Sequence, residues 1–162
     1  MHMKIRVGFG YDVHKLGESE ELWIGGIKVE HTKGSIGHSD GDVLIHAICD
    51  ALLGAANMRD IGYHFPDNDP SLKGIDSKIL LKKTIKLLDD NGFSIGNIDS
   101  TIALERPKLK DIIPQMQMTL SDVMGIEPED IAIKATTTEK LGFVGEQMGI
   151  AAYATVLIEK RD

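Results

Sequence analysis

The sequence predicts an α+β fold in a single domain, with a mixed β-sheet and helices packed on one face of it. The chain has 162 residues, enough for one domain with a sizeable core. The predicted elements follow the order β, β, α, α, β, α, β, β, which is typical of this class. No internal repeat or low-complexity tract interrupts the order, so we expect one domain over residues 1–162.

The first third of the chain is predicted to be β structure. Apolar residues alternate with polar or small ones at Ile5, Val7 and Phe9, which is the period of a strand. Residues 22–29 place two adjacent glycines between apolar arms, the pattern of a two-residue hairpin turn. Residues 1–2 precede this pattern and receive no functional assignment.

The central part of the chain is predicted to start with a helix over residues 40–55. Ser39 and Asp42 are placed as a capping box at its start, with Asp in place of the usual Glu. Residues 56–75 contain two prolines, three aspartates and no sustained period, so we expect a long loop. Loops of this length inside a compact domain usually have a function.

The remaining predicted elements are two helices and three strands. They are a helix over about residues 76–90 that ends at Asn91-Gly92, a strand over residues 94–105, a helix that begins near Pro114 and ends at Gly125, and strands over residues 131–135 and 150–158. The last two strands bring the C-terminal third into the predicted sheet.

Composition argues against nucleic acid or a membrane as the main partner. The 18 Lys and Arg residues are outnumbered by 25 Asp and Glu residues, giving a formal net charge of −7. An anionic ligand must therefore be held by local devices such as metal ions, helix N-termini or backbone N–H groups. Cys49 is the only cysteine, no apolar run approaches 18 residues, and no signal pattern is visible, so we expect a cytoplasmic protein.

Asp12, His14 and His46 are candidate metal ligands. If the chain stays extended after the first strand, Asp12 and His14 share one face and can bind one ion. His46 has Asp42 and Asp50 one helical turn away on either side, and a carboxylate partner is usual for a metal-bound histidine. One Asp and two His ligands leave a tetrahedral position open, as in catalytic Zn²⁺ sites. Alternatively, His14 is an exposed turn residue and His46 is satisfied by a neighbouring acid.

Two further stretches could bind anions. His38 and Ser39 precede the 40–55 helix, whose N-terminus favours negative charge, although capping alone would explain Ser39. Three consecutive threonines at residues 136–138 follow a predicted strand and can hold phosphate oxygens without net positive charge. Glu139 adds a carboxylate of the kind that holds Mg²⁺ against phosphates. Alternatively, the threonines are ordinary β residues ending in a cap.

The loop at residues 60–70 combines acidic side chains with Gly62 and Pro66. A polar, constrained loop of this kind can bind a polyhydroxylated substrate and cover a site, or it can be an ordinary surface loop. Residues 105–109, ERPKL, indicate no more than the end of a strand. Position next to a site would decide between these interpretations.

Five blocks of sequence together closely resemble the 2-C-methyl-D-erythritol 2,4-cyclodiphosphate synthase family, over nearly the whole chain. They are DVH at residues 12–14, HSDGDVLIHAICDALLGA at 38–55, DIGYHFPDNDP at 60–70, PKL at 107–109 and ATTTEKLGF at 135–143. The resemblance implies a homotrimer with active sites at the subunit interfaces, each built from a metal site on one chain and a cytidine pocket on the next.

The resemblance also implies a role for individual residues. Asp12, His14 and His46 would bind Zn²⁺, and Glu139 would hold a second divalent ion, Mg²⁺ or Mn²⁺. His38 and Thr137 would stabilise the transition state. The implied substrate-binding residues, which include several of these, are Asp12, Val13, His14, His38, Ser39, Asp60, Ile61, Gly62, Phe65, Pro66, Asp67, Asn68, Asp69, Leu104, Glu105, Arg106, Pro107, Lys108, Leu109, Thr136, Thr137, Thr138, Glu139 and Phe143.

The implied reaction converts 4-diphosphocytidyl-2-C-methyl-D-erythritol 2-phosphate to the 2,4-cyclodiphosphate with release of CMP, in the non-mevalonate route to isoprenoids. Nucleophile and electrophile are both phosphates, so the protein must fold the substrate back, neutralise repelling oxygens and stabilise charge. No side-chain nucleophile is needed. Two other functions stay open: a zinc-dependent phosphate ester hydrolase and a trimeric nucleotide-binding module without turnover.

The sequence departs from the family pattern after LGFVG. The family commonly has an arginine there, associated with binding phosphate near the trimer axis, and a glutamate two residues later. Glu146 and Met148 occupy these positions here. The resemblance therefore does not extend to binding isoprenoid diphosphates along that axis.

Overall fold

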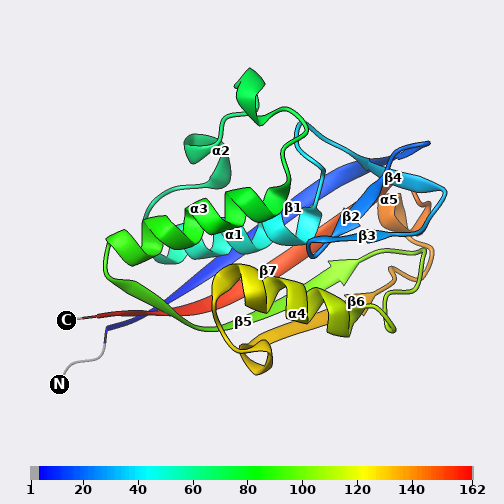
Figure 1. The fold of residues 1–162 in the computed structure, drawn as a ribbon. Helices are drawn as coiled ribbons and strands as arrows, with labels where there is room; N and C mark the ends of the chain where they lie inside the picture. Colours follow the sequence, from blue (N-terminus) through cyan, green and yellow to red (C-terminus); the bar gives the residue numbers. More distant parts are fainter. Residues whose placement is uncertain (1–3, 162) are drawn as a thin grey trace.

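The computed structural model describes residues 4–161, so Met1 and His2 lie outside the described residues. Its five-stranded sheet has the order β4-β1-β7-β5-β6, and a separate two-stranded sheet pairs β2 with β3 (Figure 1). The strands are β1 (Lys4–Glu18), β2 (Leu22–Ile24), β3 (Ile27–Val29), β4 (Lys33–Ile36), β5 (Phe93–Ala103), β6 (Ile131–Thr136) and β7 (Gly149–Lys160). The helices are α1 (Val43–Ala55), α2 (Ile61–His64), η1 (Pro70–Leu72), α3 (Ser77–Asp90), α4 (Ile113–Met124), η2 (Pro128–Asp130) and α5 (Gly142–Gly145).

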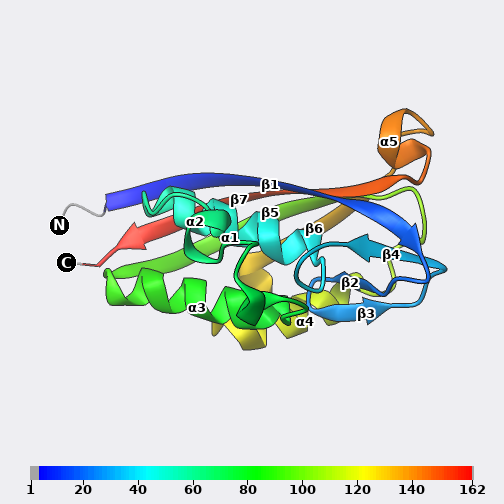
Figure 2. The same ribbon diagram turned by 90° about the horizontal axis from the view of Figure 1, so that it is seen from above.

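The predicted fold class is confirmed. The large sheet is mixed, because β5 and β6 are parallel whereas β1 pairs with β4 and β7 in antiparallel fashion. Helices α1, α3 and α4 lie on one side of it (Figure 2). Within residues 4–161, no helix is both long enough and apolar enough to cross a membrane.

Helix α1 lies directly against β1 because the facing residues are small. A Cβ added at Gly8 would overlap the backbone oxygen of Ala51, and one added at Gly10 would overlap that of Ala47. Ten of the helix's residues are buried and apolar, so burial of the helix stabilises the core. This close contact brings the next inward-facing residue of β1, Asp12, towards His46.

The first strand is longer than expected and carries its apolar residues on the outer face. β1 continues for 15 residues, so Asp12 and His14 lie within it and not beyond its end. Their side chains face α1 by the two-residue period. The opposite face exposes a row of large apolar side chains: Ile5, Val7, Phe9, Tyr11 and Val13.

Several predicted boundaries need correction. Helix α1 begins at Val43, and its cap is Asp42, which accepts the N–H of Ile45. The predicted capping box is therefore wrong, because Ser39 lies outside the helix and its hydroxyl lies beside His46. The expected loop at 56–75 contains the short helices α2 and η1. The sequence patterns also gave no sign of β4 and α5, which have four residues each.

The other predicted elements are confirmed within one to three residues. Gly25 and Gly26 both have positive φ, at 62° and 78°, as the hairpin turn between β2 and β3 requires. Asn91 is the C-terminal cap of helix α3, and Gly125 is the C-terminal cap of α4, with a left-handed φ of 68°. The strand predicted over 94–105 is two residues shorter at its C-terminal end, since β5 ends at Ala103.

Candidate active site

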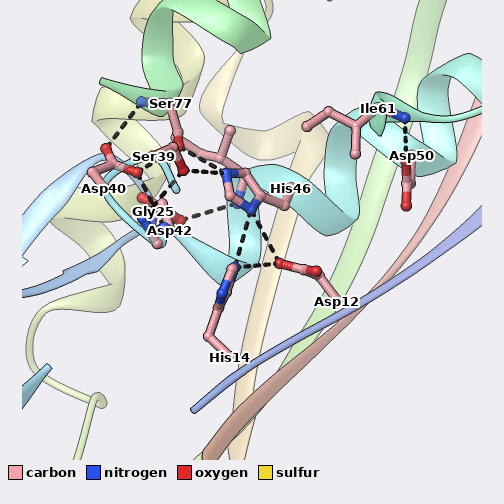
Figure 3. A network of polar contacts seen from close by, with 12 residues as sticks. Asp12, His14, Gly25, Ser39, Asp40, Asp42, His46, Asp50, Ile61 and Ser77 are labelled. Atoms are coloured by element: carbon pink, nitrogen blue, oxygen red, sulfur yellow. Dashed lines mark hydrogen bonds and ion pairs between the residues drawn. The ribbon is translucent and has the colours of Figure 1, made fainter. Parts of the chain in front are cut away.

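Asp12, His14 and His46 meet in one place, as expected (Figure 3). Asp12 Oδ2 lies 2.8 Å from His14 Nε2 and 3.1 Å from His46 Nδ1. The two imidazole nitrogens are 3.1 Å apart. β1 supplies two of these groups on one face, and α1 supplies the third.

The donor set fits a zinc ion. In a tetrahedral Zn²⁺ site with metal–ligand bonds of about 2.0 Å, neighbouring ligand atoms are about 3.3 Å apart. The three separations between the ligand atoms are close to that value, so little movement is needed for one ion to reach all three atoms. The side chains are 12–26% exposed, which leaves one side open for a fourth ligand.

Asp12 and His14 perturb each other's protonation. Burial alone would raise the pKa of Asp12, but the close contacts with the His14 and His46 rings, and the positive charge of those rings when protonated, outweigh burial and lower the pKa to about 2. Burial would lower the pKa of His14, yet the hydrogen bond to Asp12 and its charge raise that pKa above its usual value. Without an ion, Asp12 therefore stays ionised at neutral pH. His14 stays protonated to a higher pH than a free histidine does.

We expect zinc affinity to fall as the pH is lowered through the raised pKa of His14. Zinc needs the neutral imidazole, so below that pKa binding must displace a proton, whereas Asp12 stays ionised down to about pH 2. Each displaced proton weakens apparent affinity by about tenfold per pH unit. Competition with a chelator of known affinity at pH 6 and pH 8 measures this. Equal affinity at the two values would contradict the assignment of His14.

The partners of His46 differ from those expected. Its ring forms polar contacts with Asp12, His14, Ser39 and Ser77, and with neither Asp42 nor Asp50. The carboxylate of Asp42 is fully buried and accepts the backbone N–H groups of Gly25, Gly26 and Ile45. Asp50 accepts the N–H of Ile61 and so holds the start of α2.

Two serine hydroxyls take the place of those carboxylates. His46 Nε2 lies 2.9 Å from the Oγ of Ser77 and 3.1 Å from the Oγ of Ser39. Ser39 was a predicted site residue, but Ser77 was missed. Its position at the start of α3 signals only a helix start, and nothing in the local sequence shows that the hydroxyl reaches His46.

A cavity of about 490 Å³, here the metal-side cavity, opens beside the three ligands. It gathers eleven of the predicted site residues: Asp12, His14, His38, Ser39, His46, Ile61, Gly62, Phe65, Pro66, Asp67 and Asn68. The sequence analysis missed three further lining residues, Leu72, Ile75 and Leu80, whose apolar character resembles that of ordinary core positions. The 60–70 loop therefore lies next to the candidate metal site, where a ligand in the cavity could reach its residues.

A second cavity of about 430 Å³ lies where β5 and β6 end, and we call it the threonine-side cavity. Predicted residues on its walls are Leu104, Pro107, Lys108, Leu109, Thr136 and Thr137. Lys110, Ile113, Lys134 and Ala135 complete the lining and were not predicted. The two cavities share no lining residue.

The remaining predicted residues border neither cavity: Val13, Asp60, Asp69, Glu105, Arg106, Thr138, Glu139 and Phe143. Val13 points to the outer face of the sheet, away from the metal ligands. Asp60 caps α2. The backbone oxygen of Asp69 lies 3.1 Å from the Nε2 of His38, a hydrogen bond that fixes the ring of His38 at the rim of the metal-side cavity.

Residues 137–140 form an irregular turn after β6. The N–H of Glu139 donates to the Oγ1 of Thr137 at 3.3 Å. Glu139 and Lys140 have positive φ values of 54° and 62°, which cost of order 1 kcal/mol each for such residues. Glu139 is exposed, and its carboxylate is free to meet a ligand from outside the chain. Strained backbone of this kind is concentrated at functional sites.

The metal ligands and the threonine block stand on opposite sides of the sheet's centre. Asp12 pairs with Ala152 of β7, Ala152 with Ile102 of β5, and Ile102 with Ala135 of β6. Three strand spacings of about 4.8 Å separate Asp12 from Ala135, about 14 Å in all. Residues that the family resemblance assigns to one substrate thus fall into two separate halves of a single chain.

A candidate three-ligand metal site with an open position, on the wall of a cavity in an α+β domain, is typical of a metal-dependent enzyme. The chain matches the model of the YgbB family over residues 5–159, and it belongs to that family.

Curated relatives and solved structures agree with this assignment. The chain is 70% identical over 158 residues to 2-C-methyl-D-erythritol 2,4-cyclodiphosphate synthase of Bacteroides thetaiotaomicron, covering 98% of this chain and 99% of the relative. It is also similar to IspF of Plasmodium falciparum in complex with CDP, with a TM-score of 0.86, 34% identity and full coverage of both chains. The bifunctional IspDF of Campylobacter jejuni gives a TM-score of 0.95 at 40% identity, covering 99% of this chain and 44% of that one.

Proposed function

We propose that this protein is a lyase that converts 4-diphosphocytidyl-2-C-methyl-D-erythritol 2-phosphate to 2-C-methyl-D-erythritol 2,4-cyclodiphosphate and CMP. An oxygen of the 2-phosphate attacks the β-phosphorus, and the bond from that phosphorus to the bridging oxygen of CMP breaks. No water enters the products. The observation that carries the proposal is the Asp12, His14 and His46 cluster on the wall of the metal-side cavity, in a chain 70% identical to a synthase of this name.

The protein's own residues position the phosphates. His38, held by its bond to the backbone of Asp69, and Ser39 border the same cavity as the metal ligands. On the threonine side, Thr137 Oγ1 accepts the N–H of Glu139, which leaves its own hydroxyl hydrogen to donate to a phosphate oxygen. We assign transition-state stabilisation to His38 and Thr137, because such donors lower the barrier where charge develops.

We assign Zn²⁺ to Asp12, His14 and His46, and Mg²⁺ or Mn²⁺ to Glu139 together with substrate phosphates. When bound, these ions supply Lewis-acid charge and a template for the reacting phosphates. The assignment suits the metal-side cavity, because none of its lining residues is a lysine or arginine and an ion there would supply the positive charge that phosphates need. The exposed carboxylate of Glu139 has room for the oxygens of a ligand.

We also propose that the active form is a homotrimer, in which the metal-side cavity of one subunit faces the threonine-side cavity of the next. The separation of the two cavities within one chain supports this arrangement. The threonine-side cavity would take the cytidine end, in keeping with the CDP complex described for the Plasmodium falciparum relative. Each substrate would then bridge two subunits, and a single chain would hold no complete site.

The outer face of the sheet supplies the surface for such an assembly. Val7 and Phe9 are 66% and 64% exposed, and Tyr11 stacks near Tyr153 of β7 with ring centroids 5.2 Å apart. Monomeric proteins rarely leave so continuous an apolar surface in water. Copies of this chain that cover one another's β1 would bury it.

We expect Val7→Lys to give a monomeric, inactive protein that still folds. A buried lysine in each copy of the interface costs several kcal/mol, whereas the exposed side chain is tolerated in the single chain. Light scattering would show the mass of one chain, 17.7 kDa, in place of three. Ile79→Lys is the control, since Ile79 is 45% exposed on α3 and lies away from this face. A trimeric, active Val7→Lys protein would contradict the proposed interface.

Incubation of the zinc-loaded protein with the cytidyl substrate and Mg²⁺ tests the activity itself. We expect CMP and the cyclic diphosphate in equal amounts, identified by mass. Release of inorganic phosphate or a linear diphosphate would instead identify a hydrolase. CMP binding without any product would identify a binding module.

A further inference from the structure

We infer that Ser77, together with Asp40, is a positioning pair that selects the tautomer of His46 and fixes its ring for the metal ion. The inference rests on the proposed metal site and deepens it. Neither residue touches Asp12 or His14, and both act through His46. Ser77 is fully buried at the first position of α3, 31 residues from His46 in the sequence.

The hydrogen bonds around Ser77 allow one assignment. The hydroxyl of Ser77 donates to Asp40 Oδ1. A serine hydroxyl has a single hydrogen, so its oxygen can only accept from His46 Nε2, which lies 2.9 Å away. His46 therefore carries its hydrogen on Nε2, and the lone pair on Nδ1 points at Asp12 and His14.

Hydrogen bonds hold Asp40 in place, and they determine that Ser77 is the donor in the hydrogen bond between the two side chains. Asp40 Oδ2 accepts the backbone N–H of Ser77 at 2.9 Å, and its Oδ1 accepts the N–H of Asp42 at 3.1 Å. Its own backbone N–H donates to the oxygen of Ile75 at 3.1 Å. The carboxylate is thus satisfied by donors alone and cannot offer Ser77 a hydrogen. Reversal of the Ser77 hydroxyl would leave an acceptor facing an acceptor.

Ser39 cannot replace this pair. Its hydroxyl is 3.1 Å from the same nitrogen, but it also accepts the N–H of Gly41 and borders the cavity where we place the substrate. Its hydrogen is therefore free for a phosphate oxygen. Ser77 is shielded from solvent and lines neither cavity, so a ligand in the metal-side cavity would not compete for its contact with His46.

Two measurements test the inference. Histidine-selective ¹⁵N NMR of the zinc-loaded wild-type protein should show His46 protonated at Nε2 and metal-bound at Nδ1. In metal-free Ser77→Ala, signals of the other tautomer should gain intensity. Zinc affinity of Ser77→Ala, measured against a chelator, should fall about 10- to 100-fold, the usual effect of losing a partner of a metal-bound histidine.

Ser121→Ala is the matched control, because Ser121 is a buried helical serine whose hydroxyl donates to the backbone oxygen of Ile126 far from the site. Its zinc affinity should equal that of the wild type. Zinc bound through Nε2 of His46 in the wild type would overturn the inference without need of a variant. So would wild-type zinc affinity in Ser77→Ala. Failure of the wild type to bind zinc would instead overturn the proposed metal site.

Discussion

His46→Ala should lose zinc and activity together, with kcat/KM falling on the order of 10³-fold or more. A catalytic metal ion stabilises the charge of the transition state by several kcal/mol, and each step of about 1.4 kcal/mol is a factor of ten in rate. With Nδ1 of His46 gone, only the two ligands from β1 remain, too few to retain the ion at ordinary zinc concentrations. Elemental analysis of the purified variant and steady-state kinetics measure both effects.

We expect His46→Ala to form the same trimer, because His46 contacts Asp12 on the face of the sheet that the helices cover. The proposed interface lies on the opposite, exposed face of the sheet. His31→Ala is the control: it removes a histidine from the segment between β3 and β4, which borders neither cavity. We expect His31→Ala to keep zinc and activity. If His46→Ala turned over substrate normally without metal, the site would be refuted.

Subunits that are each inactive should restore activity when they are mixed. Thr137→Ala removes the hydroxyl donor of the threonine-side cavity, and we expect turnover to fall on the order of 10²-fold with zinc content unchanged. In trimers reassembled from equal amounts of His46→Ala and Thr137→Ala chains, some interfaces join an intact metal side to an intact threonine side. Random assembly makes this about one interface in four, so we expect about a quarter of wild-type activity.

The mixing result separates an interface site from a site within one chain. If each chain held a complete site, every chain in the mixture would carry one defect, and activity would stay at the level of the inactive parents. Each parent reassembled alone is the control for the procedure. A zinc-deficient Thr137→Ala protein would show that Thr137 supports the fold and not the reaction.

Local patterns marked Asp12, His14 and His46 as candidate metal ligands but left a structural role open, and the family resemblance chose between the two interpretations. The period of two places Asp12 and His14 on one face of a strand, and an amphipathic helix carries His46. The partners of His46 could not be predicted in this way, because they depend on tertiary contacts. The backbone N–H groups of the hairpin turn donate to the carboxylate of Asp42. Ser77, on α3, contacts His46 although the two residues are 31 positions apart in the sequence.

The outer face of β1 shows a second limit of sequence patterns. Alternation reveals that a strand has two different faces, but it does not say which face meets the core of its own chain. Here the face with Gly8 and Gly10 turns inward because α1 approaches too closely for side chains, and the apolar face turns outward. Short elements such as β4 and α5 carry too few residues for a period to be visible.

The most direct test of the proposed cyclisation is to run the reaction in H₂¹⁸O and to measure the masses of the products by mass spectrometry. The zinc-loaded protein should release CMP and the cyclic diphosphate with no ¹⁸O in either, because the substrate's own phosphate is the nucleophile. The same protein stripped of metal should release neither. Incorporation of one ¹⁸O atom into CMP or into a linear diphosphate would show that water attacks, and the proposed cyclisation would be wrong.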